Sequence, residues 1–158
     1  MANAKTKEFE IYVTTLADPT ADNTTLDMTD YVDIADNQAF EVHEVDIVLD
    51  PTETFPSALT ECIFQLADSN IQAFVSHADR TSLYIARQTF DNASLGMWHQ
   101  ESFSSITPLI VQKTLFLRQQ NTAGGLSLNF TLRIKGRIVS PSAKDYMALV
   151  LTQTGNVA

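Results

Sequence analysis

Apolar and polar residues alternate along the chain with a period of two, most regularly in residues 126–139. The even positions there are apolar or glycine, from Leu126 to Ile138, and the odd positions are polar or charged as far as Arg137. This pattern predicts a β-strand with one buried face, far longer than the usual five or six residues. Gly136 interrupts the apolar face, which predicts a bend or the close approach of another backbone.

Shorter runs of the same kind predict further strands. They begin near residues 8, 39, 61, 70, 82, 98 and 108, which gives eight strands in all. The strand at 39–50 changes phase, because its apolar residues fall on even positions up to Val42 and on odd positions from Val45. One extra residue near His43 and Glu44 would produce this change, so we predict a β-bulge there.

Three polar stretches predict irregular structure. Residues 16–25 are rich in turn formers and acids and predict a surface loop, and residues 118–125 predict a hairpin loop that ends in two glycines. Residues 26–36 predict either one or two helical turns or an irregular segment, with aspartates at positions 27, 30, 33 and 36. These carboxylates would form a solvated acidic face or attract a cation such as Ca²⁺, which favours several oxygen ligands.

The last part of the chain changes to a helical period. Ser142 and Asp145 have the spacing of a capping box, and Gly155 has the position of a helix stop. The helix is predicted at about 143–154. Its apolar residues form one stripe, through which it should pack: Ala143, Tyr146, Met147, Val150 and Leu151.

Many short strands with turns between them, and little helix, predict an all-β fold. Residues 1–158 are about one domain's worth of chain. Eight strands in two sheets is the number of a jelly roll. We therefore predict a single eight-stranded jelly-roll β-sandwich with a short C-terminal helix.

Charge narrows the classes of function. Charged residues make up 18% of the chain, against about 25% in typical soluble domains. Either a threonine-rich sheet surface or extensive contact with other subunits would account for this. Residues 1–61 hold 14 acids and two lysines, whereas residues 62–158 hold five acids and eight bases. This balance disfavours nucleic-acid binding over the whole surface.

No apolar run has the roughly 20 residues that a membrane-spanning helix needs.

The sequence offers no convincing catalytic or cofactor site. Ser76, His77 and Asp79 have the residue types of a catalytic triad, but neighbours in one polar turn cannot normally adopt the triad geometry. The three histidines are spread over three segments, and we expect them at the surface or at an interface. Trp98 and the nine phenylalanines are expected in the core. We predict neither an enzyme nor a bound cofactor.

One charged cluster has a regular spacing. Arg133, Lys135 and Arg137 share one face of the long predicted strand, and we call them the cation row. Like charges in line repel, unless each meets an acid from a neighbouring strand or subunit. Three interpretations are open: a solvated strand face, a charge match with another subunit, and a contact with nucleic acid.

The closing pattern, "LRIKGRIVS" followed by "SAKDYMALVLTQTG", resembles that of small single jelly-roll capsid proteins of viruses that infect archaea and bacteria. The earlier "YVDIADNQAFEVHEVDIVLD", an acidic loop that leads into a bulged strand, fits the same resemblance. The resemblance implies a structural protein of the virion, whose copies, alone or with other capsid proteins, assemble into an icosahedral shell. The candidate intersubunit contacts are Arg133, Lys135, Arg137, Tyr146 and Met147.

Capsid proteins that wrap naked genomes often carry a basic N-terminal arm, but only Lys5 and Lys7 precede residue 80 here. We therefore expect nucleic-acid contact to be weak or absent.

Two other classes stay open. A carbohydrate-binding sandwich would need exposed aromatic residues, so a buried Trp98 would count against it. A coat protein of the RNA-phage type would have an open sheet above RNA and a pair of C-terminal helices, whereas the sequence predicts one helix.

Overall fold

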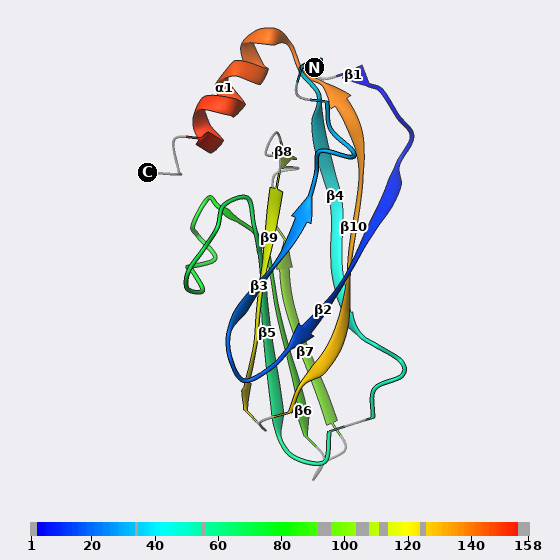
Figure 1. The fold of residues 1–158 in the computed structure, drawn as a ribbon, viewed down its shortest axis with the longest axis vertical. Coiled ribbons are helices and arrows are strands. Elements are labelled where there is room, and N and C mark those ends of the chain that lie inside the picture. The colour runs from blue at the N-terminus through cyan, green and yellow to red at the C-terminus, as the bar shows by residue number, and fades with distance from the viewer. Residues whose placement is uncertain are drawn as a thin grey trace.

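The chain forms two antiparallel β-sheets that pack face to face, with one short helix at one end (Figure 1). A computed structural model describes residues 3–33, 35–54, 56–91, 96–103, 108–110, 114–123 and 126–154. The predicted all-β class is confirmed. The elements are β1 (Asn3–Ala4), β2 (Phe9–Ala17), β3 (Asp22–Asp27), β4 (Ala39–Leu49), β5 (Thr60–Ala67), β6 (Ser82–Asp91), β7 (Gly96–Phe103), β8 (Leu109–Ile110), β9 (Thr114–Ala123), β10 (Leu128–Ser140) and α1 (Ala143–Thr154).

The long predicted strand, β10, is the centre of the first sheet. It pairs with β4 on one side and with β2 and β1 on the other, and β4 pairs in turn with β8. The second sheet has the order β3-β9-β5-β6-β7. Sequence neighbours therefore often lie in different sheets, and segments far apart in the sequence lie side by side.

The core lies between the sheets and follows the period of two. The even residues of β10 from Leu128 to Ile138 are buried and its odd residues as far as Arg137 point outward, as the alternation predicts. Phe64 of β5 and Phe130 of β10 meet across the core, with ring centroids 4.6 Å apart in an edge-to-face arrangement. This contact joins the two central strands of the opposing sheets, so the apolar face of β10 is buried as expected.

The predicted β-bulge is confirmed, and it explains Gly136. Lys135 lies opposite Glu44 and Gly136 lies opposite Val42, so His43 is the extra residue. A Cβ atom on Gly136 would lie only 2.2 Å from the backbone oxygen of Glu41. The close approach of another backbone, predicted from the sequence, therefore occurs at the bulge.

The strand predicted at 70–77 is wrong. These residues belong to a loop between β5 and β6, and the Gln65 side chain pairs with the backbone of Val75. The Gln65 amide nitrogen donates to the Val75 carbonyl oxygen at 3.1 Å, and its oxygen accepts from the Val75 amide at 2.9 Å. A side chain thus takes the place of a strand partner, and of the alternating residues Ile71, Ala73 and Val75 only Ile71 is buried.

Two predicted loops contain strand. Residues 16–25 overlap β3, and residues 118–125 overlap β9, which runs as far as Ala123. The two strands pair with each other from Asp22 to Asp27, so polar residues that are typical of loops here form an edge ladder. Within the strand predicted at 108–118, the structure describes β8 and β9, and residues 111–113 lie outside the described part.

Helix α1 begins as predicted. The Ser142 hydroxyl donates to the Asp145 carboxylate at 2.7 Å and accepts from the Asp145 amide at 3.2 Å. Tyr146 is buried against Ala39 and Val139, at the end of the first sheet. Gly155, the predicted stop, lies outside the described residues.

The prediction of one buried stripe on α1 is wrong in part. Leu149 and Val150 pack with Tyr146, but Met147 and Leu151 are exposed. The apolar residues of the helix cover a wider arc than the sandwich can bury, so part of that arc faces outward.

Candidate interaction surfaces

The cation row lies on the outer face of the first sheet, and acids flank it on both sides. Arg133 makes two hydrogen bonds to Asp46 of β4, of 3.2 and 2.6 Å. The same guanidinium also donates to Glu10 of β2 at 3.2 Å and to Glu44 of β4 at 2.8 Å. These contacts, with the Asp46 hydrogen bonds first, raise the pKa of Arg133 above its ordinary value.

The other two cations are paired in the same way. Lys135 lies 3.5 Å from Glu8, and Arg137 donates to Glu41 at 3.0 and 2.9 Å. All three cations therefore meet acids of neighbouring segments of their own chain. This explains how β10 tolerates three like charges in line.

His43, the bulged residue, bridges two of these acids. Its Nε2 lies 2.5 Å from the Glu41 carboxylate, and its Nδ1 contacts Glu8. The hydrogen bond with Glu41, then that with Glu8, raises the pKa of His43 against the opposing effect of burial. Burial acts to raise the pKa of Glu41, but hydrogen bonds from His43 and Arg137 outweigh it and leave this pKa lowered. The imidazole ring thus ties the segment before β2 to β4, a role that the sequence did not indicate.

The outer face of the first sheet has a second, uncharged half. Thr14, Thr131 and Val48 lie in one row across β2, β10 and β4, and Leu16 of β2 lies beyond them. Val48 and Leu16 are exposed. The sheet therefore presents a dense charge network toward one end and threonine and aliphatic residues toward the other.

Helix α1 presents a small apolar surface. Met147 and Leu151 lie one turn apart and have exposed fractions of 56% and 68%. Of the two helix residues that we predicted as intersubunit contacts, Met147 is accessible, whereas Tyr146 is buried within its own chain. Tyr146 therefore positions the helix, and Met147 and Leu151 face outward.

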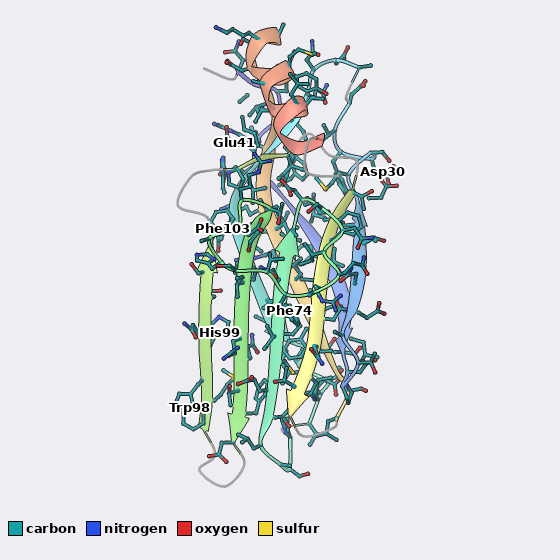
Figure 2. All side chains as sticks on the ribbon, turned by 90° about the vertical axis from the view of Figure 1, so that its left-hand side faces the viewer. Asp30, Glu41, Phe74, Trp98, His99 and Phe103 are labelled. Atoms are coloured by element: carbon teal, nitrogen blue, oxygen red, sulfur yellow. The ribbon has the colours of Figure 1, made fainter. Side chains whose placement is uncertain are left out.

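Strand β7 exposes an apolar side chain on each of its two faces. Met97 is 58% exposed and Trp98 is 57% exposed, so the predicted core position of Trp98 is wrong. β7 is the fifth strand of its sheet, whereas the described part of β8, at the edge of the first sheet, pairs with two residues of β4, Phe40 and Glu41. The described part of the first sheet therefore leaves β7 uncovered. Figure 2 shows Trp98 and His99 along this edge, with Trp98 toward the end of the molecule away from α1.

Side chains from β6 close the neighbouring edge of β4. Gln88 donates to the Ile47 carbonyl oxygen at 2.9 Å, and the Ile47 backbone also hydrogen-bonds Tyr84. The Tyr84 hydroxyl donates to Glu101 of β7 at 2.8 Å, and His99 lies 3.2 Å from the same carboxylate. The backbone groups of β4 at Ile47 are therefore already paired. The contacts that start there continue through Tyr84 to Glu101 and His99 of β7.

The residues of the considered triad are not brought together. The Ser76 hydroxyl accepts from the Ala78 amide, His77 contacts Ser102 at 2.8 Å, and Asp79 accepts from Thr81. The geometry of a nucleophile, a base and an orienting carboxylate is therefore not formed by these three residues.

The aspartates of 27–36 act locally where contacts are described. Asp27 accepts hydrogen bonds from the amide and hydroxyl of Thr29, and Asp33 accepts from the Ala35 amide. Among the residues that the structure describes, no group of three or more His, Cys, Asp or Glu side chains could hold a metal ion.

Burial raises the pKa of Cys62 to about 12, so the single thiol of the chain is both inaccessible and protonated.

No protein-family model matches the chain, and no curated protein sequence matches it. No helix in the described part of the chain is long and apolar enough to cross a membrane.

Proposed function

We propose that the sandwich is a jelly roll, and that the protein is a capsid subunit which assembles with copies of itself into the icosahedral shell of a virion.

The strand pairs are nested. β2 pairs with β10, β3 with β9, β4 with β8, and β5 with β6. The first and third of these pairs belong to one sheet, and the second and fourth belong to the other. A long antiparallel ribbon rolled up in this way is a jelly roll of eight strands. In this assignment β1 and β7 are additions at the sheet edges.

A fold alone does not give a function. The observation that carries the capsid proposal is the presence of two separate apolar surfaces on ordered elements. Met147 and Leu151 are exposed on α1, and Met97 and Trp98 are exposed on the two faces of the edge strand β7. Figure 2 shows α1 at one end of the molecule and Trp98 toward the other. Exposed apolar residues that gather on one element mark contact sites. Two different surfaces on one chain allow each copy to hold more than one neighbour, which a closed shell requires.

The cation row and the acids around it form a mixed-charge surface that is a candidate contact between subunits. Its cations are paired within the chain, so they would meet a neighbouring subunit as an alternating pattern of both signs. The acids around the row outnumber its bases, which makes phosphate a poor partner for this face. The outward side chains of Arg133, Lys135 and Arg137 therefore remain candidate protein contacts.

Expression of the chain, followed by sedimentation velocity and negative-stain electron microscopy over a range of salt concentrations, tests the proposal. We expect closed shells or rings of capsomer size. A double variant, Met147→Lys with Leu151→Lys, should keep the circular dichroism of the subunit and lose assembly, because both side chains already face solvent. Thr25→Lys, an exposed position on β3, is the matched control and should assemble normally.

Assembly of the double variant at the level of the control would exclude α1 as a contact. A wild-type chain that stays monomeric under all these conditions would contradict the capsid proposal itself.

One observation favours a second candidate, a carbohydrate-binding module. Trp98 is exposed, and its strand neighbour Gln100 lies opposite Arg87 on the outer face of the second sheet. An exposed indole beside polar side chains can stack on a sugar ring. Titration of the intrinsic tryptophan fluorescence with a set of oligosaccharides tests this candidate. Saturable quenching that Trp98→Ala abolishes would support it, and no response would leave it without support.

The RNA-phage type of coat protein has a different arrangement. Its single open sheet and pair of C-terminal helices contrast with the two face-to-face sheets and the one helix in the described part of this chain. We do not propose it.

A further inference from the structure

Within the described part of the chain, the outer edge of β7 lacks the features that usually protect an edge strand. Natural edges carry lysines, prolines, bulges or covering segments, which block pairing with another chain. β7 reads GMWHQESF, with Glu101 as its one acidic residue and neither lysine nor proline, and its ladder with β6 runs from Asp91↔Gly96 to Tyr84↔Phe103 without a register shift. By contrast, Tyr84 and Gln88 cap the edge of β4.

The two faces of β7 follow from its register with β6. Trp98, Gln100 and Ser102 lie opposite outward residues of β6 and therefore point to the outer face of the sheet. The alternate residues, from Met97 to Phe103, point toward the side of the facing sheet. Each face thus carries one large apolar side chain that its own chain leaves exposed, Trp98 on one and Met97 on the other.

We propose that β7 pairs antiparallel with β7 of a second copy, about a two-fold axis that passes beside Gln100, so that two five-stranded sheets become one continuous sheet. This inference deepens the proposed function and rests on it, because it names one of the contacts through which copies assemble.

The sequence of β7 is self-complementary in this register. His99 lies opposite Glu101 of the second copy, and Glu101 lies opposite the second copy's His99, so an imidazole faces a carboxylate twice, beside the contact of 3.2 Å that His99 and Glu101 make within each chain. On the same face, Met97 lies opposite Phe103, and a thioether packs favourably against an aromatic ring. On the outer face, Trp98 lies opposite Ser102, which is small enough for the indole to cover. Cross-strand pairs of these kinds stabilise antiparallel ladders.

Neighbouring two-fold registers lack this match. In an antiparallel pair related by a two-fold axis, the central residue lies opposite itself. Moving the centre by one residue shifts the pairing by two, so residues of the same face still lie opposite each other. Centring on His99 places two histidines opposite each other and Met97 opposite Glu101. Centring on Glu101 places two carboxylates opposite each other, which is destabilising. The pattern of charges therefore selects Gln100 as the centre.

A stable isolated dimer needs an interface that buries at least roughly 1,000 Å² of surface, and a single pair of short strands buries less than this. We therefore expect this contact to be weak between free subunits. The β7 contact becomes stable when other contacts already hold the same two copies together, because its formation is then an intramolecular step.

Cysteine cross-linking tests the register. In an antiparallel pair, opposite Cα atoms lie about 4.5–5.5 Å apart, within the span of a disulfide. The natural Cys62 is buried and does not interfere. Mild oxidation of Gln100→Cys should give a covalent dimer on a non-reducing gel, whereas His99→Cys, Glu101→Cys and the control Thr25→Cys should give little or none. An equal yield for all four variants, or a dimer from Thr25→Cys alone, would overturn the inference.

A charge variant separates this inference from the proposed function. Gln100→Lys places two ammonium groups opposite each other at the axis, at an exposed position where the fold should tolerate the change. We expect a melting temperature close to that of wild type and a loss of shells or rings, with Thr25→Lys as the assembling control. Shells that form normally with Gln100→Lys would refute the β7 contact and leave the capsid proposal standing. Covalent Gln100→Cys dimers without any larger assembly would support the contact and contradict the shell.

Discussion

Gly136 gives the sharpest test of the packing at the β-bulge. Substitution by alanine adds one methyl group in a buried position on the core side of β10. That carbon would lie 2.2 Å from the Glu41 carbonyl oxygen and 2.7 Å from Cζ of Phe40. Real Cβ contacts are essentially never shorter than 3.0 Å, so the neighbours must move by at least about 0.8 Å. Because β10 lies between β2 and β4, it has no free side toward which it can shift.

Overpacking of a core usually costs 1–3 kcal/mol, and we expect Gly136→Ala to cost about 3 kcal/mol because the closest atom belongs to a central strand's backbone. For a chain of this size, that corresponds to a fall in melting temperature of roughly 6–12 °C. Calorimetry or thermal circular dichroism would measure it. Thr131→Ala is the control on the same strand, because its side chain points outward and its loss should cost at most about 0.5 kcal/mol.

A double-mutant cycle with Phe40→Leu separates the two clashes. Leucine lacks the Cζ atom, so Gly136→Ala should cost about 1 kcal/mol less in the Phe40→Leu background than in wild type. A Gly136→Ala protein within about 0.5 kcal/mol of wild type would show that the backbone of Glu41 does not exclude a Cβ atom at position 136.

Three further variants test groups with defined partners. The raised pKa of His43 contributes stability that is fully present below its ordinary value of 6.5 and is lost as pH rises through the folded value. His43→Gln should therefore lower the melting temperature more at pH 5.5 than at pH 8.5. Burial raises the pKa of Asp68 to about 6, a shift that opposes folding once the carboxyl ionises. Asp68→Asn should therefore stabilise the protein at pH 8 by up to about 3 kcal/mol and give no gain at pH 4, and a gain at both pH values would contradict this cause. Ser142→Ala removes the hydroxyl that caps α1 and should cost about 1 kcal/mol, with faster hydrogen exchange in the first turn of the helix.

Features that depend on neighbouring residues were predictable from the sequence. The period of two identified β10, the change of phase in 39–50 identified the bulge, and the spacing of Ser142 and Asp145 identified the helix start. Each of these is decided within a few residues, where periodicity and capping have a direct physical cause.

Features that depend on distant partners were not predictable. Arg133 meets Glu10, which is 123 residues away, only because β2 and β10 are adjacent in the sheet. The exposure of Trp98 depends on how far the facing sheet extends over β7. The local alternation of apolar and polar residues carries no information about that extent. The loop at 70–77 has the alternation of a strand, but its backbone partner is the side chain of Gln65.

The internal pairing of the cation row changes the expected physics of assembly. If these cations paired with acids of another subunit, added salt would screen that attraction and the assembly would dissociate. They instead neutralise acids of their own chain, and each copy still carries a net charge of −9. Copies that carry the same net charge repel each other, whereas the proposed contacts on α1 and β7 include the exposed apolar side chains of Met147, Leu151, Met97 and Trp98. Salt then screens the repulsion and leaves the apolar contacts in place, so the sedimentation series should show more assembly as salt rises. Assembly that weakens steadily with salt would instead assign the dominant contact to charge pairs between subunits.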